Sequence, residues 1–135
     1  MIDTYVWSPR LLAALRILTA LLFLEHATMK FLQFPGPLPG VGYPLPTIIV
    51  AAGIIEAVTG TLVLVGLFTR IAAFIASGEM AAAYFMAHFP QGFWPALNQG
   101  EMAIMFCFVF LYLAVTGAGS WSIDEILRTR RGEVK

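Results

Sequence analysis

Charged residues and cysteine are both scarce in this chain of 135 residues. Charged side chains make up 12% of the sequence, whereas an ordinary soluble domain holds about 25%. Because Cys107 is the single cysteine, an intramolecular disulfide is excluded, and we expect no cysteine-based metal site. Eight cationic residues balance eight acidic ones. The net charge is therefore zero, and we expect no nucleic-acid partner, because such binding depends on neutralising phosphates.

Hydrophobic residues dominate instead, at 59% of the chain. They form four runs, each close to the roughly 20 residues that a helix needs to cross a bilayer. The runs cover residues 9–31, with Pro9 placed at a helix start, and residues 46–67, 70–88 and 100–116. They are continuous rather than alternating, which favours helices over barrel strands. The sequence therefore predicts one all-α membrane domain over residues 1–135, built as a four-transmembrane-helix bundle.

The connections between the runs predict the orientation. Residues 34–46 and 89–99 are rich in proline, glycine and aromatic residues and contain neither lysine nor arginine. The cations near the ends of the runs lie at the N-terminus, in the short turn after residue 67 and in the tail, residues 117–135. By the positive-inside rule, both termini are cytoplasmic. In the tail, Ser122 and Glu125 have capping-box spacing, which predicts a short interfacial helix.

Each apolar run also carries one glutamate. The ionisable residues predicted within the bundle are Glu25, Glu56, Glu79, Glu101, Arg16, Lys30, His26 and His88. Charged groups at membrane depth are costly, face the bundle interior and usually mark function. Two cations against four carboxylates leave two carboxylates in excess. Unpaired buried carboxylates take up protons or recruit a cation, so we expect a polar pocket in the middle and outer parts of the bundle.

Small residues accompany two of these glutamates. Gly53 and Gly60 flank Glu56, and residues 76–83 around Glu79 include Gly78 and several alanines. Small side chains let membrane helices approach each other closely. We therefore expect both carboxylates to be buried between helices.

The residue types favour a quinone site and leave other interpretations open. Glu56, Glu79 and His26 would act as catalytic, proton-carrying groups. The ligand-binding residues would be Lys30, Glu25, Glu101 and His88. The same carboxylates suit a proton-coupled transporter of small molecules, and ion pairs between helices suit purely structural roles. No Glu-x-x-His or zinc spacing occurs, so no metal site is predicted, and two lone histidines do not predict a haem.

Several segments together resemble the DoxX family of bacterial four-helix membrane proteins. They lie at residues 16–31, 53–56 (GIIE), 66–70 (GLFTR), 83–95, 98–101 (NQGE) and 117–124. The resemblance implies a multi-pass protein of the bacterial inner membrane. It also implies a link to redox chemistry, because the family includes subunits related to thiosulfate:quinone oxidoreductase and a member of a membrane-associated redox-defence complex.

The leading hypothesis is therefore a quinone-linked oxidoreductase subunit in contact with membrane lipid and redox partner proteins. A proton-coupled transporter and a non-catalytic scaffold for a redox complex are the alternatives. Whether the chain is itself an enzyme, and whether it forms a homo-oligomer, are left open by the sequence.

Overall fold

The computed structural model describes residues 3–132, and all regular structure in that range is helical. Four long helices form the body of the protein: α1 (Thr4–Leu32), α2 (Thr47–Val65), α3 (Thr69–Ala83) and α5 (Glu101–Thr116). The shorter elements are a π-helical turn (Tyr84–His88), a 3₁₀ turn (Phe89–Gln91), α4 (Pro95–Asn98) and α6 (Ile123–Arg130). The all-helical prediction is confirmed for these residues.

The first helix begins earlier than its proline suggests. The Asp3 side chain accepts a hydrogen bond from the backbone N–H of Tyr5, so α1 begins at Thr4 and Pro9 lies inside it. The prediction that Pro9 marks the helix start is therefore wrong. A side-chain cap satisfies an N–H group that the first turn leaves without a partner, which explains the earlier start.

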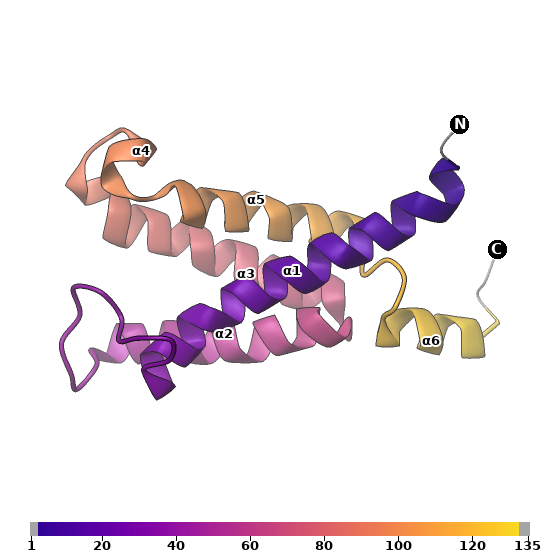
Figure 1. The fold of residues 1–135 in the computed structure, drawn as a ribbon, viewed down its shortest axis with the longest axis horizontal. Helices are drawn as coiled ribbons and strands as arrows, with labels where there is room; N and C mark the ends of the chain where they lie inside the picture. Colours follow the sequence, from indigo (N-terminus) through magenta and orange to yellow (C-terminus); the bar gives the residue numbers. More distant parts are fainter. Residues whose placement is uncertain (1–2, 133–135) are drawn as a thin grey trace.

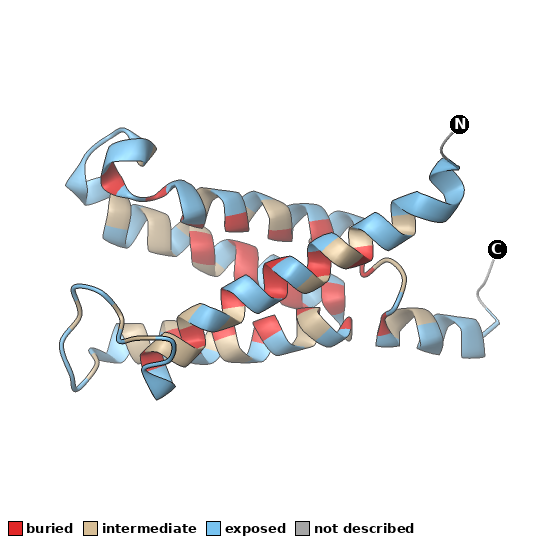
Figure 2. Cartoon of the chain, in the orientation of Figure 1, coloured by how far each residue is buried: buried red, intermediate tan, exposed pale blue. Residues whose placement is uncertain are grey.

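The long helices form two antiparallel pairs, α1 with α2 and α3 with α5, joined by the packing of α2 on α3 (Figure 1). The core lies where the pairs meet (Figure 2). At its centre the Phe23 and Phe110 rings pack edge to face, with centroids 4.7 Å apart. Ala72, Ala73 and Ala76 give α3 a flat face in this core, which lets neighbouring helices approach closely.

Two ends of the bundle can be distinguished in Figure 1. The tail end holds the start of α1, the turn between α2 and α3, and the link from α5 to α6; the backbone N–H of Ser120 bonds to the carbonyl of Pro9 there. The loop end holds the two long connections. This arrangement agrees with the predicted topology, while the side of the membrane that each end faces stays a prediction.

Three stretches are long and apolar enough to cross a membrane: Thr4–Leu32, Thr47–Val65 and Thr69–Gln91. Helix α5 is apolar but has 16 residues. At 1.5 Å per residue it extends about 24 Å, which is less than a hydrocarbon core of about 30 Å. The fourth predicted span therefore stays a prediction. In the tail, Ser122 Oγ accepts from the backbone N–H of Glu125 at 3.1 Å, which confirms Ser122 as the N-cap of α6.

Candidate functional site

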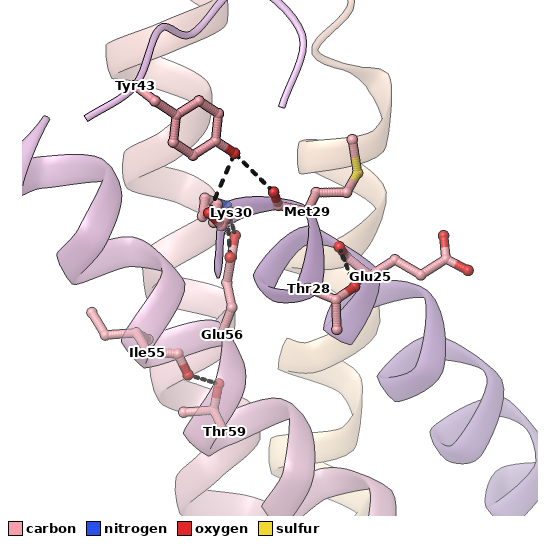
Figure 3. Close-up of polar contacts among 8 residues, drawn as sticks. All are labelled: Glu25, Thr28, Met29, Lys30, Tyr43, Ile55, Glu56 and Thr59. Carbon is pink, nitrogen blue, oxygen red and sulfur yellow. Dashed lines mark hydrogen bonds and ion pairs between the residues drawn. The ribbon is translucent and has the colours of Figure 1, made fainter. Parts of the chain in front are cut away.

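A buried ion pair joins α1 to α2. Lys30 Nζ lies 2.7 Å from Glu56 Oε1 and 2.6 Å from Glu56 Oε2. The two side chains are only 7% and 2% exposed. Figure 3 shows them meeting between the helices. Removing two charges from water is costly, and a short two-oxygen contact offsets much of that cost.

Glycine makes the approach of these helices possible. A Cβ placed on Gly53 would lie 2.7 Å from Phe31 Cζ and 3.0 Å from Lys30 Cδ. About two turns further along the same face of α2, a Cβ on Gly60 would lie 2.8 Å from Leu24 Cδ2. A Cβ at either position would force these α1 side chains to move from their places against α2. The predicted role of the two glycines around Glu56 is thus confirmed.

The third member of the cluster is Glu79 on α3. Its Oε2 atom is buried and has no hydrogen-bond partner among the described residues. The carboxyl lies close enough to Glu56 and Lys30 for their charges to act on it. Buried polar atoms in proteins are nearly always hydrogen-bonded, so a partnerless carboxyl oxygen needs an explanation. Two carboxyl groups and one ammonium therefore share the middle of the bundle.

The small residues near Glu79 contribute less than the sequence predicts. Gly78 is exposed, and a Cβ placed there would meet nothing within 4 Å. Ala82 is exposed as well. The prediction that both help to bury Glu79 is wrong, because they lie on the outer face of α3. Ala76, by contrast, is fully buried.

His26 lies beside this group. It is half-buried, and its ring and the Phe106 ring pack edge to face at a centroid distance of 5.8 Å. The charge of Lys30 also acts on it. On the loop-end side, the Tyr43 hydroxyl donates to the carbonyl of Met29 at 3.1 Å (Figure 3). The sequence prediction missed Tyr43, although a hydroxyl-bearing aromatic residue at an interfacial loop was a usable signal.

Three predicted ligand-binding residues lie elsewhere. Glu25 is exposed, and its side chain points away from the bundle in Figure 3. Glu101 is exposed at the first position of α5. His88 Nδ1 lies 3.0 Å from the carbonyl oxygen of Asn98, and its ring stacks against Tyr84. The structure therefore brings together Lys30, Glu56 and Glu79, with His26 adjacent.

Arg16 has a different environment from the one that the charge count assumed. It is fully buried, and its guanidinium donates only to backbone carbonyls. The acceptors belong to Val63, Leu64, Ala118, Ser120 and Trp121. It forms no ion pair with any of the four glutamates. Arginine can do this because it carries five N–H donors in a fixed plane, so Arg16 holds the tail end together.

Asp124 completes the tail end, and the sequence prediction missed it. Its two carboxylate oxygens each lie 2.9 Å from a backbone nitrogen, that of Phe68 and that of Thr69. An anion at a helix N-terminus satisfies free N–H groups and complements the helix dipole. Within residues 3–132, no group of three or more His, Cys, Asp and Glu side chains is arranged to hold a metal ion.

The family model for DoxX matches residues 11–89, more than half of the chain. The chain belongs to the DoxX family. The matched residues include Lys30, Glu56 and Glu79. The chain is also 45% identical to an uncharacterised protein of Haemophilus influenzae, over 88% of this chain and 92% of that protein.

A second relative is an uncharacterised membrane protein of Mycobacterium tuberculosis. It is 30% identical, over 90% of this chain and 89% of the relative. No solved structure matches the chain. The assignment of this chain to a family of membrane proteins therefore rests on sequence similarity and on its apolar helices.

Proposed function

We propose that this DoxX-family protein is the membrane subunit of a quinone-linked redox system, with Lys30, Glu56 and Glu79 as its quinone-binding and proton-handling group. The observation that carries the proposal is the buried Oε2 atom of Glu79, which has no partner among the described residues. A bound molecule with a hydrogen-bonding oxygen would supply that partner. A lipophilic quinone reaches such a site from the bilayer.

The available donors fit a ring with two carbonyl oxygens. An ammonium group has three N–H bonds, and Lys30 directs its contacts to the two oxygens of Glu56. One N–H bond of Lys30 is thus left to bind a carbonyl oxygen. A protonated Glu79 offers the second donor, while the half-buried His26 stands next to the pair.

When bound, the quinone supplies the electron-accepting chemistry, taking up two electrons and two protons to become a quinol. A redox partner protein would supply the electrons. The chain itself provides protons and orientation. Glu79 donates a proton and is reprotonated, Lys30 polarises the carbonyl, and Glu56 keeps Lys30 in place. General acid groups of this kind accelerate reactions by about 10² to 10⁴.

A purely structural role accounts for only part of the cluster. The Lys30–Glu56 pair links α1 to α2 and needs no third group for that purpose. Glu79 adds a carboxyl on a half-buried side chain, and its buried Oε2 atom forms no hydrogen bond with any described residue. An unsatisfied buried oxygen lowers the stability of the fold. Proton transfer to a ligand would explain why a carboxyl is kept at this position.

Lipid extraction of protein purified from membranes tests the proposal, with absorption spectra of the extract and metal analysis of the protein. We expect recovered quinone, and we expect Glu79→Gln to lower quinone-reductase activity by about a hundredfold. Glu125→Gln on α6 is the matched control and leaves activity unchanged. Glu79→Gln should unfold at the same temperature as the unmodified protein, because no hydrogen bond to Oε2 is lost.

Absence of quinone from the extract, together with unchanged activity of Glu79→Gln, would reject the proposal. Proton-dependent uptake of a small molecule into liposomes, abolished by Glu79→Gln, would replace it with a transporter. Normal capture of a redox partner without either activity would replace it with a scaffold.

A further inference from the structure

Helix α1 presents a second ionisable residue to the outside of the bundle. The Glu25 side chain is exposed, points away from the other helices in Figure 3, and forms no hydrogen bond or ion pair with any residue in the range 3–132. Only its backbone carbonyl is engaged, by the hydroxyl of Thr28. An exposed glutamate is common at the membrane–water interface. Whether Glu25 needs a partner therefore depends on its depth in the membrane.

The packing of α1 on α2 determines that depth. Gly60 faces Leu24, and Gly53 faces Phe31. Residues of α1 between these contacts are therefore level with the middle of α2, and Glu25 lies within about one helical turn of Glu56, at 1.5 Å per residue. Glu56 is at the centre of α2, one of the stretches long and apolar enough to span the membrane. Glu25 thus faces outward near the middle of the hydrocarbon core.

An ionisable side chain exposed to lipid at that depth is costly, and such residues almost always face protein or water instead. The surface of α1 around Glu25 indicates what kind of protein surface could pack against it. The α1 outer stripe consists of Leu11, Leu15, Leu18, Leu22, Glu25, Met29 and Leu32. All of these residues are exposed except the half-buried Met29. The stripe lies opposite the buried face of α1, which includes Ala13, Ala20 and Phe23.

The stripe has the spacing of a helix-pairing surface. Its members alternate four and three residues apart along the whole span, which is the heptad pattern of two helices packed side by side. A leucine face gains little by leaving lipid for another leucine face. A single polar residue in such a face therefore determines whether, and in which register, the helices associate.

We propose that Glu25 is the central contact of a homodimer in which the α1 outer stripes of two copies pack against each other. Two copies in one membrane share the same orientation, so a two-fold axis along the membrane normal brings both Glu25 side chains to one depth. A protonated carboxyl is both donor and acceptor. The two carboxyl groups hydrogen-bond to each other when at least one carries its proton, and no other partner is needed.

The dimer leaves the Lys30, Glu56 and Glu79 group intact, because that group lies on the opposite side of α1. Cross-linking in native membranes tests the proposal in a Cys107→Ser background. Leu22→Cys lies in the stripe and is 51% exposed, whereas Val58→Cys on α2 is 55% exposed at similar depth. Oxidation should convert Leu22→Cys, and not Val58→Cys, to a species of twice the chain mass.

The role of Glu25 is measured by dilution of fluorescently labelled protein in lipid vesicles, with energy transfer as the readout. Glu25→Leu should raise the protein density needed for half-association by about tenfold, as expected for the loss of an interhelical hydrogen bond. Glu25→Gln, which retains a donor and an acceptor, should stay close to the unmodified protein. Thermal unfolding in detergent should be nearly the same for all three, since the side chain forms no hydrogen bond or ion pair with the described residues of its own chain.

Equal cross-linking at positions 22 and 58, or an unchanged association of Glu25→Leu, would overturn the proposal. A cross-link from Leu22→Cys to a different protein, without the doubled chain, would overturn it in favour of a partner subunit on the same stripe.

Discussion

Two buried cations on α1 show two ways of keeping a charge inside this bundle. Arg16, fully buried at the tail end, donates its hydrogen bonds within residues 3–132 to backbone carbonyl oxygens, while the charge of Asp124 acts on it from nearby. Lys30, near the middle of the bundle, meets the carboxylate of Glu56, with the carboxyl of Glu79 nearby. The donors of Arg16 connect α1 to the end of α2 and to the link between α5 and α6. In the Lys30 group, Glu56 already balances the charge of Lys30, so Glu79 is an additional carboxyl.

The difference separates structure from chemistry. Carbonyl dipoles have no proton to exchange, so the Arg16 network is a mechanical joint. Carboxyl groups do exchange protons, so the Lys30 group can change its charge state when a ligand arrives. Membrane charges are often assigned to function as a class. Here the chemical nature of the acceptors distinguishes the joint from the candidate site.

The largest expected effect is at the joint. Arg16→Leu removes the donors to five carbonyl groups, and the free energy of unfolding should fall by about 3–5 kcal/mol, as for other losses of a buried charged partner. Arg16→Lys should be nearly as damaging, because one ammonium cannot replace the donors to residues 63–64 and to residues 118–121 together. Thermal unfolding in detergent measures both. A fall of less than about 1 kcal/mol, the size of one ordinary hydrogen bond, would contradict the role of Arg16.

A smaller and reversible effect is expected at Lys30. Lys30→Met leaves the buried Glu56 carboxylate without its partner and should lower the free energy of unfolding by about 3 kcal/mol. Adding Glu56→Gln should restore more than half of the loss, because the stranded charge is then gone. A double-mutant cycle from four melting curves gives the coupling. Additive losses would show that the two residues do not act as a pair.

Glycine substitutions compare how closely the backbone is packed at the tail end and near the Lys30–Glu56 pair. Gly66 has φ 70°, and a Cβ there would collide with Ser122 Cβ and lie 3.0 Å from the backbone Cα of Ser122. Gly66→Ala should therefore cost about 2 kcal/mol. Gly53→Ala, in regular helix, meets the ring end of Phe31 and the stem of Lys30, and should cost about 1 kcal/mol because side chains move more easily than backbone.

Unfolding of both variants in detergent checks this order. If Gly53→Ala were the more destabilising of the two, α1 and α2 would be packed more rigidly near the ion pair than at the tail-end joint, and the comparison above would be reversed.

The part of the site that could be predicted from sequence follows from composition and spacing. Long apolar runs locate the helices, and glycines about one turn to either side of Glu56 indicate where α1 approaches α2. The pairing of Lys30 with Glu56 needed the register between helices, which no local pattern contains. Arg16 was counted with the glutamates because its charge was visible in the sequence and its carbonyl acceptors, scattered between residues 63 and 121, were not.

The sequence by itself determined that this is a helical DoxX-family membrane protein with scarce charge and a glutamate in each apolar run. A chain this apolar must use lipid as its solvent, whatever its tertiary contacts. Only the tertiary structure decided which glutamates meet. Helix rotation buries Glu56, half-buries Glu79 and exposes Glu25, because the faces with small and core-forming side chains pack together and carry their polar neighbours with them.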